Sequence, residues 1–237
     1  MKRLGLLILT IMVLSDLNTY AEKSVEGHKI DFSLDIYSRH LWRGFVNGNS
    51  LSIQPAAEYS YSGFSAGAWA AASIDGSYYE FDLYTSYALG SFEITLYDYF
   101  CPVKPLSDNE FFEIEEGKTK HTFDLNIEYA QPEKHPFALL AATMIFGDDL
   151  NPDNGKNHYS TYIEPSYNIT IYTVDMQAFA GFTPFKSYYA SSASFVNTGV
   201  AFARSFLIAG NFSIEANMKL AYNPDSKKGW ISLGISL

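Results

Sequence analysis

Residues 81–100 read FDLYTSYALGSFEITLYDYF, and this stretch decides the fold. Apolar and polar residues alternate on both sides of Gly90-Ser91. Successive side chains of a strand point to opposite faces, so the stretch predicts two strands that each have one apolar and one polar face. Gly90-Ser91 suits a two-residue turn with glycine in the first central position. Such a turn pairs Leu89 with Phe92 and puts both apolar rows on one face of a β-hairpin.

The same alternation recurs along the chain and predicts about twelve strands of roughly ten residues, the length that a tilted strand needs to cross a bilayer. The expected strands cover residues 30–39, 51–61, 64–74, 81–89, 92–100, 121–130, 137–146, 159–169, 172–181, 195–206, 212–222 and 230–237. The exact strand count and the register near 195–206 are left open by the pattern.

The connections between the expected strands alternate in length. Those near positions 62, 90, 131, 170 and 209 are mostly short, and those near 46, 76, 110, 152, 187 and 226 are mostly longer. Short periplasmic turns and longer outer loops are typical of outer-membrane barrels. We therefore expect an all-β protein, an antiparallel transmembrane β-barrel of about 12 strands with both termini on the periplasmic side.

Composition narrows the function. The chain has 237 residues, 16% of them aromatic, and a formal net charge of -10. Nucleic acid needs a basic footprint on its partner, so this charge argues against such a partner. The single cysteine, Cys101, cannot form an internal disulfide. A soluble sandwich is also disfavoured, because the apolar rows would form a large exposed patch in water.

Residues 1–21 have the features of a signal peptide. Lys2 and Arg3 form a basic start, residues 4–14 are an apolar run, and small residues precede position 22. The run is too short for a spanning helix, which needs about 20 apolar residues. We expect a signal peptide at 1–21, an outer-membrane barrel at 22–237, and a location in the outer membrane of a Gram-negative bacterium.

Short motifs spread over nearly all of the mature chain resemble those of the TorF-like porins and related outer-membrane proteins of Bacteroidetes-type bacteria. The matching stretches are LWRG at 41–44, QP at 54–55, YSGF at 61–64, GAW at 67–69, EFD at 80–82, YDY at 97–99, YSTYIE at 159–164, GFTP at 181–184 and GISL at 234–237. The resemblance implies a porin-type barrel in the outer membrane, and it brings no catalytic residues.

The polar rows of the strands are strongly acidic. If the apolar rows face lipid, the polar rows line the lumen, and carboxylates there favour cations. The lumen-lining candidates are Arg39, Glu58, Glu80, Asp82, Asp124, Glu128, Glu164, Asp175 and Lys219. We expect a narrow porin-like channel for small, cationic or neutral solutes. The alternative is a structural or surface-interaction barrel whose lumen is blocked by packed polar side chains.

The remaining segments have simpler interpretations. Trp42-Arg43-Gly44 at the end of the first strand suggests an interfacial aromatic with an arginine that reaches a headgroup, although Arg43 as a charge at the lumen rim is a second possibility. Residues 101–119 contain two prolines and four glutamates, so we expect an exposed outer loop.

Two patterns that could carry chemistry depart from their motifs. Residues 149–155 resemble the start of a calcium loop, but the glycine falls one position late and Ser160 stands where a bidentate Glu is needed. His158-Tyr159-Ser160 resembles the pair of outer-membrane phospholipases, but the expected Asn-Gly is replaced by Thr161-Tyr162. We therefore expect no enzyme activity, catalytic residue, metal or cofactor. The expected partners are outer-membrane lipids, lipopolysaccharide, small solutes and the barrel-assembly machinery.

Overall fold

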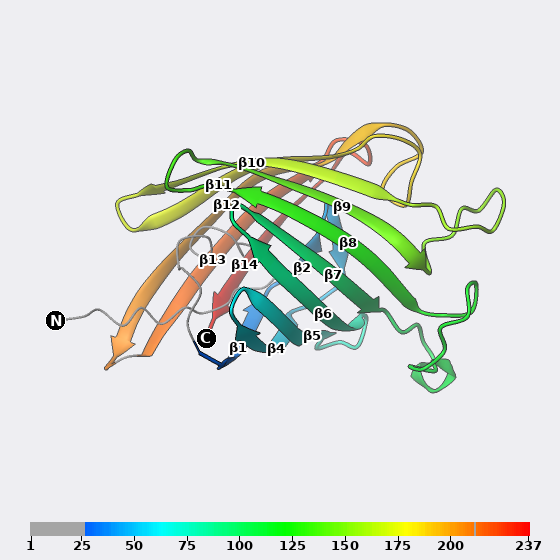
Figure 1. Cartoon of the computed structure of the whole chain (residues 1–237), viewed down its shortest axis with the longest axis horizontal. Coiled ribbons are helices and arrows are strands. Elements are labelled where there is room, and N and C mark those ends of the chain that lie inside the picture. The colour runs from blue at the N-terminus through cyan, green and yellow to red at the C-terminus, as the bar shows by residue number, and fades with distance from the viewer. Residues whose placement is uncertain (1–26, 211) are drawn as a thin grey trace.

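The computed structural model describes residues 27–210 and 212–237, and within them twelve strands form one closed antiparallel barrel (Figure 1). The order around the barrel is β1-β14-β13-β12-β11-β10-β9-β8-β7-β6-β5-β4. The predicted fold class is confirmed. The predicted signal peptide at 1–21 lies outside the described residues.

The barrel strands are nine to sixteen residues long, which suffices to cross a bilayer. They are β1 (Lys29–Tyr37), β4 (Ser52–Tyr61), β5 (Phe64–Ser73), β6 (Tyr79–Leu89), β7 (Phe92–Phe100), β8 (His121–Ala130), β9 (Phe137–Gly147), β10 (Thr161–Ile171), β11 (Val174–Thr183), β12 (Ser194–Ala209), β13 (Phe212–Asn223) and β14 (Lys228–Ser236). Two short strands, β2 (His40–Trp42) and β3 (Phe45–Asn47), pair only with each other. A 3-10 turn, η2 (Leu106–Asp108), lies between β7 and β8.

The hairpin of β6 and β7 has the predicted register. Leu89 pairs with Phe92, and Asp82 pairs with Tyr99 further along the two strands. Gly90 has a φ of 64°, a left-handed conformation that glycine adopts without steric cost. The local pattern of residues 81–100 therefore fixed both the pairing and the turn.

The two ends of the barrel differ in the length of their connections. The turn end holds the short connections at 62–63, 90–91, 131–136 and 172–173 and the one at Gly210, together with the start of β1 and the end of β14. The loop end holds the segments 38–51, 74–78, 101–120, 148–160, 184–193 and 224–227. In Figure 1 the longer loops gather at the right of the view. Within the described part of the chain, no helix is long and apolar enough to span a membrane.

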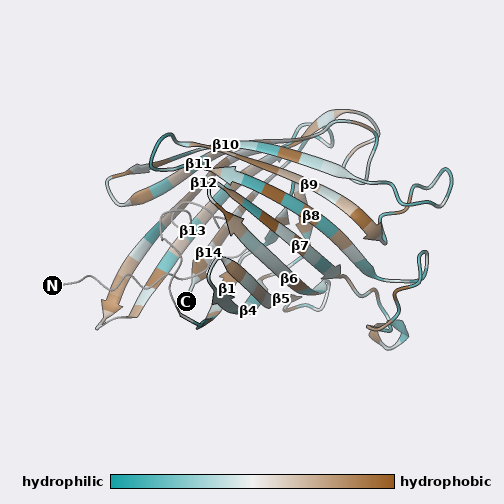
Figure 2. Ribbon diagram, viewed as in Figure 1, coloured by the Kyte–Doolittle hydropathy of each residue, from teal (hydrophilic) through white to brown (hydrophobic). Residues whose placement is uncertain are grey.

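The apolar rows of the strands face outward and the polar rows face inward, as the sequence predicts. On β6, Phe81 and Leu83 are exposed, whereas their neighbours Glu80 and Asp82 are buried. Figure 2 shows the alternation as brown and teal bands along the strands. An outward apolar surface of this extent cannot be solvated by water at low cost, and lipid is the solvent that suits it.

Candidate functional site: the barrel lumen

The segment between β1 and β4 forms a small β-hairpin. His40 pairs with Asn47 and Trp42 with Phe45, and Arg43-Gly44 forms the turn between them. Both turn residues have positive φ, 43° for Arg43 and 85° for Gly44. Positive φ at both central positions is the conformation that matches the twist of two paired strands in a two-residue hairpin.

This hairpin does not project into solvent but folds into the lumen, where its tip meets β12, three strands away from β1 around the barrel. A Cβ on Gly44 would lie 1.8 Å from the carbonyl oxygen of Val196 on β12, so the two backbones touch. Asn223 on β13 donates a hydrogen bond from Nδ2 to the Gly44 carbonyl oxygen at 3.2 Å. Leu41 is buried in an apolar cluster whose other members include Phe179. The tip of the hairpin is therefore fixed against the wall formed by β11 to β13.

Arg43 provides the main polar attachment of the hairpin. Its Nη1 lies 2.8 Å from Oδ2 of Asp124 on β8, and its Nη2 donates to Oδ1 of Asn126 at 2.8 Å. Nη1 also donates to the hydroxyl of Tyr189 at 2.7 Å. Burial on its own lowers the pKa of the guanidinium, but Asp124 and Tyr189 raise it well above its ordinary value. Arg43 is therefore a permanent cation inside the barrel.

His40 attaches the other strand of the hairpin to the near wall. Its Nδ1 lies 3.1 Å from Nε2 of Gln54 on β4, and its Nε2 lies 3.4 Å from Oε2 of Glu80 on β6. The imidazole ring also lies 5.4 Å from the ring of Trp69. His40 is buried, and these three side chains surround its ring.

A second loop closes over the hairpin. Trp42 contacts the rings of Tyr188 and Tyr189, which belong to segment 184–193, and the ring of Tyr99 on β7. We call residues 40–47 together with Tyr188 and Tyr189 the lumen cap. The lumen cap contacts strands on all sides of the barrel, so it fills much of the lumen near the loop end.

The candidates named from the sequence fall into three groups. Glu80, Asp82 and Asp124 face inward and are buried beside the lumen cap. The second group is half-buried on the inner wall: Glu58, Glu128, Glu164, Asp175 and Lys219. Within it, Glu164 lies next to the lumen cap, because Tyr162, which donates to it, also contacts the Tyr189 ring. Arg39 lies beyond the end of β1 and is exposed, which departs from its expected place on the inner wall. β1 ends at Tyr37, where the chain leaves the wall, and the alternation that placed Arg39 ends there.

The half-buried acids have hydrogen-bond partners that orient them. Tyr84 donates to Oε2 of Glu58 at 2.9 Å, and Thr170 donates to Oδ1 of Asp175 at 2.6 Å. Asn197 donates to Oε2 of Glu164 at 2.9 Å. Glu58 and Asp175 lie near the turn ends of β4 and β11 and stay partly accessible to water, so the turn-end half of the lumen is a wet, negatively charged vestibule.

Among the predicted lumen residues, Lys219 on β13 is the cation that lies on the inner wall. Its Nζ lies 4.8 Å from the centre of the Phe179 ring, which is a cation–π geometry. Lys29 at the start of β1 adds a second cation, with Nζ 3.0 Å from Oδ2 of Asp31. Acids still outnumber bases along the inner wall.

The interfacial interpretation of Trp42-Arg43-Gly44 is wrong, because all three residues lie in the lumen cap. His40 and Tyr189 are lumen residues that the sequence pattern did not predict. A signal was present: the segment HLWRGFVN at 40–47 has apolar residues on both sides of a two-residue turn. An outer loop with this much apolar surface needs a partner to cover it.

The two motifs weighed for chemistry have structural roles. Ser160 donates a hydrogen bond from Oγ to Oδ1 of Asp149 at 2.6 Å and accepts one from the backbone N–H of Tyr188 at 2.7 Å. Both Ser160 and Asp149 are buried and hold two loops together. Asp153 pairs with Lys186 instead. Among residues 27–210 and 212–237, no group of three or more His, Cys, Asp or Glu side chains could hold a metal ion.

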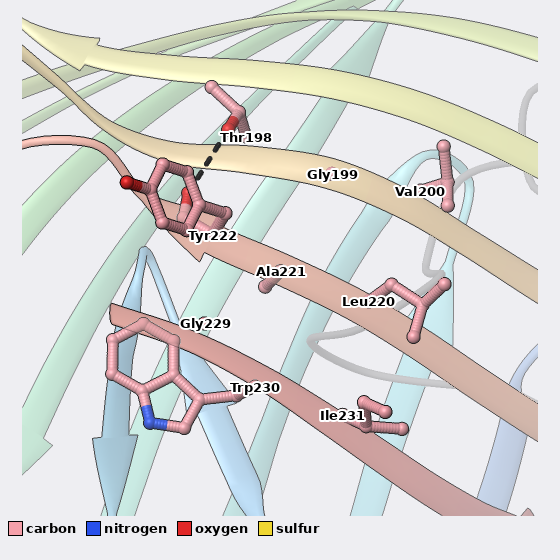
Figure 3. A pocket seen from close by; sticks show the side chains of 9 residues that line it. All are labelled: Thr198, Gly199, Val200, Leu220, Ala221, Tyr222, Gly229, Trp230 and Ile231. Carbon is pink, nitrogen blue, oxygen red and sulfur yellow. Dashed lines mark hydrogen bonds between the residues drawn. The ribbon is translucent and has the colours of Figure 1, made fainter. Parts of the chain in front are cut away.

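A shallow groove on the barrel lies outside the lumen. Val200, Leu220 and Ile231 line it, together with residues of the same three strands, β12, β13 and β14 (Figure 3). Thr198 donates from Oγ1 to the Tyr222 carbonyl oxygen at 3.1 Å beside it. The side chains of Val200, Leu220 and Ile231 belong to the outward rows, so this groove faces the surroundings of the barrel and is not part of the solute path.

No family model matches the chain, and no curated protein matches it. Among solved structures, a five-substitution variant of a porin from Rh. blastica is similar at 11% identity and a TM-score of 0.38, and the match covers 78% of this chain and 55% of that chain. A structure titled "Asymmetric conductivity of engineered proteins" is similar at 10% identity and a TM-score of 0.39, with the same coverage. The chain thus spans about half the length of these structures, and scores this low carry no argument about its function.

Proposed function

We propose that this protein is a porin-type barrel of the bacterial outer membrane, with its loop end outside the cell. We further propose that it is a narrow channel for small cationic or neutral solutes, narrowed at the loop end by the lumen cap. The observation that carries the proposal is the hairpin 40–47, which folds into the lumen of a closed barrel and is fixed by Arg43 to Asp124. The resemblance to TorF-like porins supports a channel rather than an enzyme.

The charge of the inner wall supports the solute class. The half-buried carboxylates, among them Glu58, Glu128 and Asp175, raise the local concentration of cations and repel anions. Screening by salt acts over about 10 Å at 0.1 M, so selectivity should weaken as salt rises. At the lumen cap, Arg43 stands beside Asp124, so the narrow part of the lumen is less acidic than the vestibule.

A bilayer recording tests the channel. The wild-type protein should show small conductance steps, and a variant in which residues 40–47 are replaced by a Gly/Ser linker should show larger ones. Replacement of residues 106–113 in the outer loop by the same linker is the matched control and should leave the conductance unchanged. Equal conductance in all three proteins would show that the hairpin does not narrow the path.

Ion selectivity is tested separately with the triple variant Glu58→Gln, Glu128→Gln, Asp175→Asn. These residues lie away from the lumen cap, whereas Glu80 and Asp124 contact it, so the triple variant changes the charge without releasing the hairpin. The reversal potential in a salt gradient should move toward that of a non-selective pore. An unchanged reversal potential would remove these three carboxylates from the mechanism.

A barrel with a blocked lumen is the second candidate, and one observation favours it. Gln54, Asp82 and Asp124 have no exposed surface, so the part of the lumen beside the cap is densely filled. Such a barrel would act through its outer loops and would serve a structural role among the lipids and lipopolysaccharide of the membrane. If both the wild type and the 40–47 variant insert into bilayers and neither conducts, this second function is the correct one.

A further inference from the structure

The outer wall at the loop end is covered over part of its circumference by the chain itself. Phe100 on β7 and His121 on β8 belong to the outward rows of their strands, yet they are 8% and 3% exposed. Phe81 and Leu83 on the same face are 38% and 42% exposed. The cover comes from segment 101–120, whose Phe111 ring lies 5.1 Å from Phe100, 5.0 Å from His121 and 5.9 Å from Phe81.

A buried polar contact holds this cover in place. Each ring nitrogen of His121 lies within hydrogen-bond distance of an acceptor: Nδ1 is 2.7 Å from Oδ1 of Asp98, and Nε2 is 2.6 Å from the carbonyl oxygen of Phe111. The wall therefore binds both the ring and the backbone of Phe111. Segment 101–120, predicted as an exposed outer loop, is exposed over most of its length but packs on the outside of the barrel at Phe111.

Two apolar residues after Phe111, separated by Glu113, are exposed. Phe112 is 90% exposed and Ile114 is 62% exposed. The Phe112 ring lies 5.3 Å from the Phe111 ring, so it sits directly beside the covered part of the wall. This exposed surface is continuous with the outward apolar rows of β6 and β7.

The height of these residues on the barrel corresponds to a membrane interface. Phe111 packs on Phe81 and Phe100, which lie near the loop ends of β6 and β7, and a second aromatic pair, Phe123 and Phe146, lies at the same end of β8 and β9 with ring centres 5.9 Å apart. Outward aromatic residues at the two ends of the apolar belt mark the membrane–water interfaces of outer-membrane barrels.

We propose that residues 111–114 are an interfacial anchor whose Phe112 and Ile114 insert among the lipid acyl chains of the outer leaflet. The continuity with the lipid-facing wall selects lipid as the occupant, and the exposed acids Glu115 and Glu116 follow at the point where the chain leaves the wall. The proposal rests on the membrane location given under the proposed function and does not depend on whether the lumen conducts.

Fluorescence quenching by brominated lipid tests the anchor. The native tryptophans, Trp42, Trp69 and Trp230, lie on the lumen side, so the wild-type protein supplies the background. The variants are Phe112→Trp in the anchor, Leu83→Trp in the middle of the outer wall, and Asn154→Trp in the exposed loop 148–160. Each is folded into vesicles of phosphatidylcholine that carries bromine near the glycerol end or near the methyl end of its acyl chains.

The anchor predicts a specific order of quenching. Phe112→Trp should lose emission most strongly with bromine near the glycerol end, Leu83→Trp with bromine near the methyl end, and Asn154→Trp with neither. Quenching of Leu83→Trp without quenching of Phe112→Trp would overturn the anchor and leave the membrane barrel intact. Absence of quenching in both would overturn the barrel's membrane location and the anchor together. Unquenched Phe112→Trp that is shielded in a cross-linked dimer would assign the surface to a second copy of the chain instead.

Discussion

Two long connections at the loop end pack on opposite faces of the barrel wall. Segment 38–51 turns inward, and its hairpin lies in the lumen near the loop end, whereas segment 101–120 turns outward and packs on the outside of the wall at Phe111. Both segments contain apolar residues that cannot stay in water at low cost. The inner wall covers the apolar residues of the hairpin, and the outer wall covers Phe111.

Charge explains which segment goes where. The inward hairpin carries Arg43 and His40, and the inner wall offers Asp124 and Glu80 as partners. Segment 101–120 is rich in acids, which the carboxylates of the lumen would repel. Its apolar residues remain free to pack on the outward row of the wall. The acidic lumen therefore binds the loop segment that carries cations, and the acidic segment packs on the outside of the barrel.

The largest expected effect comes from breaking the inward attachment. Arg43→Met leaves Asp124 buried without a cation and should lower the free energy of unfolding by about 3–5 kcal/mol. The matched change outside is Lys118→Met, which removes an ion pair to Glu115 that is open to solvent and should cost about 0–1 kcal/mol. Guanidinium unfolding in detergent micelles measures both. Equal costs would mean that Arg43 does not hold the hairpin.

A pair of glycines isolates the packing of the hairpin tip. Gly44 and Gly117 have nearly the same φ, 85° and 83°, but a Cβ would meet the Val196 carbonyl oxygen at Gly44 and open space at Gly117. Gly117→Ala should therefore cost only the backbone term, about 1–2 kcal/mol. Gly44→Ala should cost about 1–3 kcal/mol more, because the hairpin must move off the wall. It should also raise the conductance if the barrel is a channel, and the same effect in both variants would contradict the contact.

Phe111 and Phe112 test how segment 101–120 packs on the outer wall. Phe111 is packed on the wall, so Phe111→Ala should lower the free energy of unfolding in detergent by about 1–3 kcal/mol. Phe112 faces away from the barrel, so Phe112→Ala should lower it by less than Phe111→Ala does. Melting curves from heat-modified gel mobility would separate the two. A larger loss for Phe112 than for Phe111 would place the loop differently on the barrel.

The smallest effect concerns the reactivity of Cys101, which follows β7 at the loop end. Its Sγ lies 3.6 Å from Oε1 of Glu80 and 3.6 Å from the Tyr78 hydroxyl, so the thiol points toward the lumen side. Burial and then the Glu80 carboxylate raise the pKa of the Cys101 thiol. A raised pKa lowers the thiolate fraction at neutral pH, so maleimide should label Cys101 slowly.

A cysteine at an exposed position of the same segment gives the reference rate of labelling. Ser107→Cys in a Cys101→Ser background places a thiol on the exposed part of segment 101–120 and should react faster than Cys101 at the same pH. Raising the pH should narrow the difference, because the thiolate fraction of Cys101 increases only at higher pH. Fast labelling of Cys101 at neutral pH would show that the thiol is open to solvent, as expected for an unstructured outer loop.

The sequence by itself determined the wall of this protein. The alternation in residues 81–100 required only neighbouring residues, and the pairing of Leu89 with Phe92 follows from it. The alternation of short and long connections fixed which ends of the strands lie together. These features are local, because a strand's two faces and a turn's length are set within a few residues.

Only the tertiary structure decided on which face of the barrel wall each loop packs. Arg43 binds Asn126, 83 residues away, and Tyr189, 146 residues away, so its partners appear only when the barrel closes. Phe111 likewise needs the wall built by β6, β7 and β8 before it has a surface to cover. The local pattern could show that residues 40–47 are too apolar for water, but the choice between lumen and lipid depends on charges that closure of the barrel brings together.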